Sequence, residues 1–174
     1  AEKSRLLAEA YNKICLVNNM KIDPYNHKEK YLTWKIKIDG RIPEISQQNS
    51  DIFLRYLGDM EIGANVSIKN AKGPRGYNRL NHLREKLVFF AKQFETRFKT
   101  TNITEMTEEQ VIRFFSDMKN GTIKRLDGTQ YISVNTFASV FKSFWHWWQK
   151  VNKKKCIDIQ DITADLDTRQ EKTD

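Results

Sequence analysis

The residues with the clearest chemistry in this sequence share one side of an amphipathic segment, residues 134–152. Apolar side chains there recur at helical spacing, and opposite them are short, amide-bearing or basic residues. These are Asn135, Ser139, Lys142, His146 and Lys150. A solvated helix face usually carries more Glu, yet no Glu lies between Glu109 and Glu171. Asn can pair with adenine, and Lys can reach guanine or phosphate, so this face is a candidate for reading a nucleic acid.

A second polar face belongs to the segment 77–98, opposite a stripe of Leu and Phe. Its candidates are Asn78, Arg79, His82 and Lys86. Phe89 also points away from the apolar stripe, which predicts a contact either with the N-terminal helices or with a partner domain.

The loop before this segment, residues 64–76, contains no acidic residue. Its basic residues are Lys69, Lys72 and Arg75. Glycines flank Pro74 and Arg75, which would let the backbone approach a phosphate chain closely. Another basic run includes Lys150 and residues 153–155. With a net charge of +8 and a pI near 9.4, the chain suits a polyanionic partner, although such a surface can also serve solubility alone.

Catalytic and metal-binding patterns are missing from the sequence. The three histidines are far apart and show no metal-type spacing, and no phosphate-binding loop or nucleophile elbow occurs. Cys15 and Cys156 stand alone, which predicts two buried thiols in a reducing compartment and no zinc site. We therefore expect no cofactor, no metal, no small-molecule substrate and no membrane span, in a cytoplasmic protein.

The periodicity and the scarcity of Gly and Pro predict an all-α helical bundle. The expected helices cover 3–20, 26–38, 47–61, 77–98, 107–119 and 134–152. Capping boxes are expected at Asn26 and Thr107, and Gly63 is expected to end the third helix. Asp127-Gly128 predicts a turn, the tip of a small hairpin between residues 122–123 and 131–132.

The tryptophans of the last helix invite two interpretations. Exposed aromatic rings can stack on bases. Trp145 and Trp148 nevertheless share the sector of Phe137, Phe141 and Phe144, which favours core packing for both.

Four stretches, in this order of elements, resemble the core-binding domain of tyrosine recombinases, the phage-integrase family, in its archaeal members. They are Tyr77–Arg84, Ile103–Gln110, Phe141–Asn152 and Asp161–Thr168. The resemblance covers about residues 47–168 and implies a four-helix, SAM-like bundle with additional N-terminal helices. We expect an N-terminal helical extension (1–45), for which that family offers no counterpart. The resemblance further implies a DNA-binding domain (46–156) and a linker toward a catalytic domain (157–174).

In that family the core-binding domain clamps duplex DNA, with its second and fourth helices at the major groove. A separate C-terminal domain supplies an Arg–Lys–His–Arg–His/Trp set and a nucleophilic Tyr. The resemblance therefore implies a non-catalytic DNA-binding region whose partners are double-stranded DNA and other recombinase protomers. Arg84, Trp145 and His146 are not expected to be members of the catalytic set.

Two other function classes remain open from the sequence. A helical protein-interaction adaptor would use the basic surface to bind an acidic protein. An independent small enzyme is disfavoured because no catalytic constellation is present.

Overall fold

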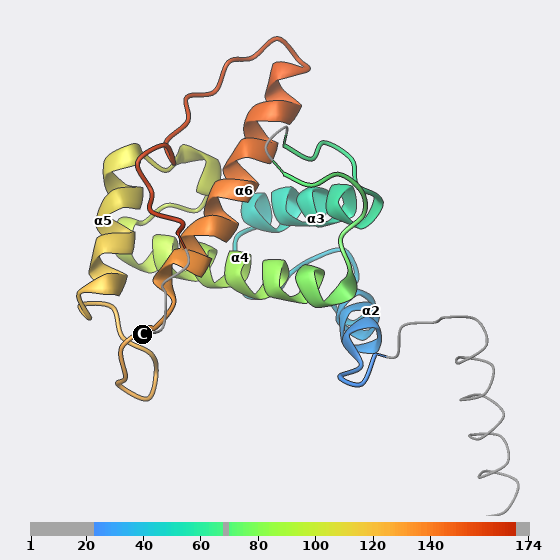
Figure 1. Cartoon of the computed structure of the whole chain (residues 1–174), viewed down its shortest axis with the longest axis horizontal. Helices are drawn as coiled ribbons and strands as arrows, with labels where there is room; N and C mark the ends of the chain where they lie inside the picture. Colours follow the sequence, from blue (N-terminus) through green and yellow to red (C-terminus); the bar gives the residue numbers. More distant parts are fainter. Residues whose placement is uncertain (1–22, 68–69, 170–174) are drawn as a thin grey trace, which may run out of the picture.

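The computed structural model describes residues 23–67 and 70–169, so the helix expected over 3–20 lies outside the described residues. The described chain is an all-α bundle of five α-helices and one 3₁₀ turn (Figure 1). The elements are α2 (His27–Ile38), α3 (Gln47–Ile62), α4 (Tyr77–Phe98), the 3₁₀ turn (Ile103–Glu105), α5 (Glu108–Lys119) and α6 (Val134–Lys153). These bounds agree with the expected helices to within a residue or two.

Local capping chemistry accounts for the boundaries of α3 and for the start of α5. The Ser46 hydroxyl accepts a hydrogen bond from the backbone N–H of Asn49, and α3 ends at Gly63 in the left-handed conformation. Thr107 and Gln110 form the expected reciprocal capping box at the start of α5.

The capping box expected at Asn26 is wrong. Asn26 adopts a left-handed conformation (φ 54°), and its side chain makes no capping hydrogen bond. The carboxylate of Asp23 instead accepts a hydrogen bond from the backbone N–H of Lys28 at 3.0 Å. An acceptor three residues further upstream therefore replaces the expected cap.

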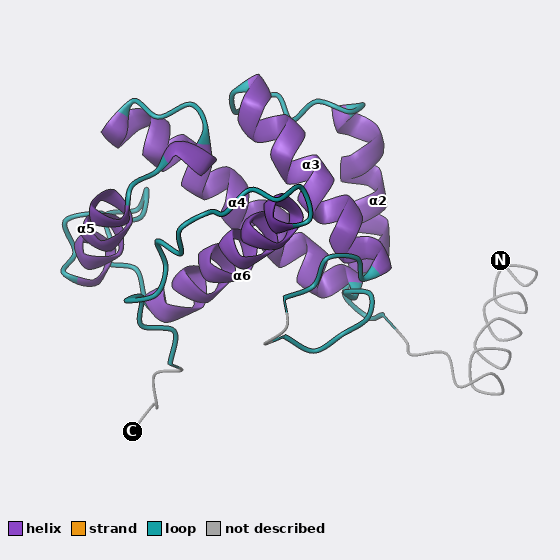
Figure 2. Cartoon of the chain, turned by 90° about the horizontal axis from the view of Figure 1, so that it is seen from above, coloured by secondary structure: helices purple, strands orange, loops and turns teal. Residues whose placement is uncertain are grey.

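Helix α4 is the centre of the bundle and contacts α2, α3 and α6. Helices α2 and α5 lie at opposite ends of it (Figure 2). Edge-on contacts among Phe90, Phe94, Phe114 and Phe141 form the middle of the core. Tyr31 of α2 is buried in the same core, so α2 packs against the rest of the bundle.

The aromatic side chains of α6 differ in burial more than the helical periodicity predicts. Trp145 and Trp147 are buried, which confirms the core position of Trp145. Trp148 is only half-buried at the edge of the core, so its expected full burial is wrong.

Phe89 packs on a part of the bundle that its sequence pattern does not indicate. Its ring packs against Tyr131 and Phe137, with centroid distances of 5.5 and 5.4 Å. The segment just before α6 and the first turns of α6 therefore cover the ring, which removes the apparent break in the amphipathic pattern of α4.

The expected hairpin reduces to one pair of residues. Lys124 and Gln130 form an isolated antiparallel bridge around the Asp127-Gly128 turn. This pairing keeps the expected register, but the described residues contain no extended strand.

After α6 the chain reverses and runs back along that helix (Figure 1). The Trp145 indole N–H donates to the Gln160 carbonyl, and the Gln149 side chain donates to the Ile159 carbonyl, both at 2.9 Å. Ile162 and Leu166 are buried, so this C-terminal segment, residues 157–169, is packed against the bundle. Cys156 at the reversal is exposed, which corrects its expected burial, and Cys15 lies outside the described residues.

Candidate nucleic-acid interface

The two ends of the loop between α3 and α4, residues 64–76, are held close together by backbone contacts. Gly63 has φ +74°, and a Cβ on it would lie 2.5 Å from the carbonyl carbon of Gly73. The backbone N–H of Arg75 donates to the Met60 carbonyl at 2.8 Å. Gly63 thus allows the two ends of the loop to approach each other, whereas an added Cβ on Gly73 or Gly76, the glycines that flank Pro74 and Arg75, would meet nothing within 4 Å.

Two of the candidate lysines fold back onto this loop. Lys72 Nζ donates to the carbonyls of Val66 and Ser67, and Lys150 Nζ donates to the Val66 carbonyl at 2.7 Å. Burial lowers the pKa of Lys150, and the charges of Lys72 and Lys154 lower it further. Positive charge is therefore concentrated where the loop meets α6. Lys69 lies outside the described residues.

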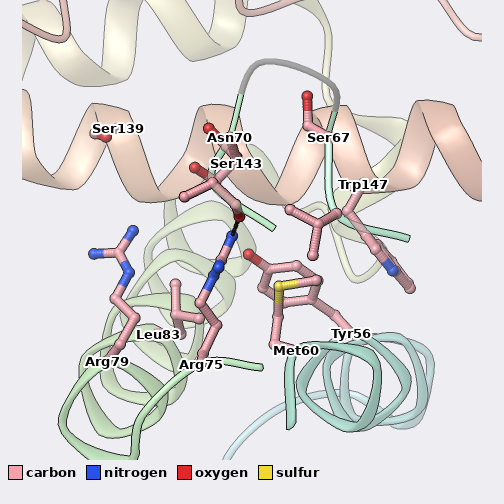
Figure 3. A pocket seen from close by; sticks show the side chains of 12 residues that line it. Tyr56, Met60, Ser67, Asn70, Arg75, Arg79, Leu83, Ser139, Ser143 and Trp147 are labelled. Carbon is pink, nitrogen blue, oxygen red and sulfur yellow. Dashed lines mark hydrogen bonds between the residues drawn. The ribbon is translucent and has the colours of Figure 1, made fainter. Parts of the chain in front are cut away.

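A cavity of about 290 Å³ opens between this loop, α3, α4 and α6 (Figure 3). Its polar lining comes from Tyr56, Ser67, Asn70, Arg75, Arg79, Ser139 and Ser143. None of the described residues that line it is a carboxylate. Arg75, Arg79 and Ser139, which are far apart in the sequence, are thus brought together as one group.

The remaining candidates on α4 differ in exposure. Asn78 and His82 are exposed, and Lys86 lies over the Phe137 ring of α6, 4.9 Å from its centroid. Burial is the main cause that lowers the pKa of Lys86, and likewise the pKa of His82. The negative charge of Glu85 raises both pKa values and so opposes both shifts. This part of α4 therefore holds an acidic residue close to the two basic ones.

The polar face of α6 is less open than its sequence pattern predicts. Asn135 is buried, and its Nδ2 donates to the Arg169 carbonyl at 2.8 Å. His146 Nε2 lies 3.2 Å from the Asp161 carboxylate. Lys142 is half-buried. The C-terminal segment therefore covers Asn135 and His146, two residues for which the sequence pattern predicts contact with a ligand.

Sequence reasoning missed four of the polar residues that line the cavity, namely Tyr56, Ser67, Asn70 and Ser143. Tyr56 occupies an apolar position of α3, and the spacing alone marks it as core. Ser143 lies one turn after Ser139 on α6, a spacing that could have drawn attention to it. Figure 3 shows the Tyr56 hydroxyl directed into the cavity near Arg75.

Two absences concern the described part of the chain only. Residues 23–67 and 70–169 hold no group of three or more His, Cys, Asp or Glu side chains arranged to bind a metal ion. None of the helices described is both long enough and apolar enough to cross a membrane.

Comparisons with known proteins return no relative. The sequence matches no protein-family model and no curated protein, and the fold matches no solved structure.

Proposed function

We propose that this chain binds duplex DNA. The observation that carries the proposal is the pair of arginines, Arg75 of the loop and Arg79 of α4, in a cavity whose described lining residues include no carboxylate. Lys72 and Lys150 are bonded to the same loop and add positive charge to it. Sequence-independent affinity for DNA comes mainly from neutralising phosphates, and this arrangement supplies the required charge.

Two kinds of contact with the duplex are expected, one to phosphates and one to base edges. Arg75, Arg79 and the lysine cluster of Lys72 and Lys150 contact phosphates and position the protein on the duplex. Asn78 and His82, exposed on α4, reach toward base edges in the major groove. Lys142 on α6 is a third candidate for the groove.

Titration of a labelled duplex at several salt concentrations tests the proposal. The logarithm of the affinity should fall by about 0.9 for each phosphate contact per log unit of salt. Lys72→Ala should weaken cognate and scrambled duplexes equally and reduce this slope by about one unit. Arg113→Gln is the control, because Arg113 is exposed on α5 away from the cavity and pairs only with Glu109. Binding that is absent at low salt, or indifferent to salt, contradicts the proposal.

The finer assignment is to the non-catalytic DNA-clamping region of a site-specific tyrosine recombinase. Its support is the resemblance of the four stretches between Tyr77 and Thr168 to that family. The 174-residue polypeptide should form no covalent adduct with a nicked suicide substrate. A trapped phosphotyrosine linkage would contradict the non-catalytic part of the assignment.

An adaptor function has one observation in its favour. Ile36 and Ile62 are 80% and 72% exposed, on α2 and at the end of α3, and apolar side chains of this kind suit a protein partner. Ile36→Ser would leave duplex binding unchanged if DNA is the ligand. Loss of duplex binding in this variant would instead place the DNA surface on α2.

A further inference from the structure

We propose that the cavity between α3, α4 and α6 is a specific binding site for one phosphate group, with Arg75, Arg79 and Tyr56 as its principal ligands. The site itself stands on the geometry of the cavity. Only the source of the phosphate rests on the proposed function, which makes it a phosphodiester of the DNA backbone.

The two arginines supply charge from one wall. Two of the five donors of Arg75 are bonded to the carbonyls of Ala71 and Gly73, at 2.9 and 3.2 Å. These bonds fix the direction of the guanidinium, and its other donors have no bond to a described residue and can serve a ligand. The Arg79 guanidinium reaches the cavity one helical turn later (Figure 3). Paired guanidinium groups match the geometry of phosphate oxygens.

Tyr56 supplies the floor of the cavity. Its side chain is only 1% exposed, yet the hydroxyl points into the cavity, and no hydrogen bond joins it to the other residues that line the cavity (Figure 3). The hydroxyl is therefore placed to donate a hydrogen bond to a ligand in the cavity. Burial raises the pKa of Tyr56 to about 12, although the charges of Arg79 and Arg75 lower it. The hydroxyl therefore remains a donor at neutral pH.

The opposite wall is α6, where Ser139 and Ser143 face the cavity one turn apart. Donors thus converge from three helices around a space with no carboxylate in its lining. A tetrahedral anion with several acceptor oxygens can accept hydrogen bonds from donors on all of these walls. A planar carboxylate can accept from fewer of them. At about 290 Å³ the space is far larger than the roughly 15 Å³ that one water needs.

The first measurement uses inorganic phosphate as the probe, at constant ionic strength set with chloride. Side-chain Nε–H signals of the two arginines and the backbone signal of Ser143 should shift saturably. Acetate should bind more weakly. Arg79→Gln and Tyr56→Phe should each weaken phosphate binding by about tenfold, and Arg113→Gln should not. Thermal unfolding confirms that each variant is folded.

The second measurement repeats the duplex titration with the same variants. If the DNA backbone supplies the phosphate, Tyr56→Phe should lower duplex affinity by a similar factor. Saturable phosphate binding with unchanged duplex affinity would keep the site but assign it to free phosphate or a phosphomonoester. Linear, unsaturated shifts in the wild-type protein overturn the site. A wild-type protein that binds phosphate but no duplex overturns the proposed function and leaves the site intact.

Discussion

Helices α4 and α6 carry polar faces that look alike in the sequence but have different environments in the fold. The first turns of α4 keep Asn78 and His82 exposed and direct Arg79 into the open cavity. On α6, the C-terminal segment hydrogen-bonds Asn135 and pairs with His146. A polar face thus shows which side of a helix avoids the apolar core, but not whether solvent, a ligand or another segment of the chain covers it.

The largest expected effect concerns the covered side of α6. Trp145→Ala should lower the free energy of unfolding by about 3–5 kcal/mol, because it empties core volume and removes the donor to the Gln160 carbonyl. Trp148→Ala is the comparison, and it should cost clearly less because Trp148 is half-buried. Urea unfolding measures both. Equal losses would mean that Trp148 belongs to the core as fully as Trp145.

The next effect concerns the loop that shapes the open side. Gly63→Ala should cost about 2 kcal/mol or more, since it combines an unfavourable positive φ with a Cβ 2.5 Å from the Gly73 backbone. It should also weaken duplex binding, because the loop carries Arg75. Gly128→Ala is the matched control, with φ +80° but nothing within 4 Å of the added Cβ. A Gly63→Ala loss no greater than that control would show that the loop ends are not fastened together.

Two asparagines test the difference between the faces directly. Asn78→Ala should leave stability unchanged and reduce discrimination between cognate and scrambled duplexes by about 1–3 kcal/mol, if Asn78 contacts a base. Asn135→Ala should leave discrimination unchanged and cost about 1 kcal/mol of stability, because its hydrogen bond to the Arg169 carbonyl is lost. Duplex titrations and urea unfolding of the two variants measure these effects. The reverse pattern would mean that the C-terminal segment leaves α6 when DNA binds.

Helix bounds and most caps could be predicted because they depend on neighbouring residues. Periodic apolar residues set the length of α4, while Thr107 and Gly63 mark helix ends through local hydrogen bonding and backbone conformation. The cavity could be predicted only in part, through its arginines and Ser139. Tyr56 has the spacing of a core residue, and nothing local reveals that its hydroxyl faces a space between helices. The covering of Asn135 likewise depends on a contact 34 residues away in the chain.

The smallest effect concerns how the C-terminal segment is held on α6. Burial alone would raise the pKa of Asp161, but hydrogen bonds from Thr163 and His146 lower it below its ordinary value of 3.8. The ionised carboxylate therefore stabilises the fold above about pH 4, and this contribution is lost as the pH falls through the lowered pKa. Asp161→Asn should cost about 1 kcal/mol at pH 7, and the difference from wild type should shrink as the pH falls below 3.8.

Asp127 offers a matched control for this last prediction. It accepts the same pair of hydrogen bonds from Thr129 that Asp161 accepts from Thr163, but it lies in the exposed turn away from α6. Asp127→Asn should therefore leave the contact between the C-terminal segment and α6 intact. That contact can be followed by hydrogen exchange at the Trp145 indole N–H, which Asp161→Asn should accelerate and Asp127→Asn should not. If both variants accelerate this exchange equally, the carboxylate acts only through its local turn, and the pairing with His146 does not hold the segment on α6.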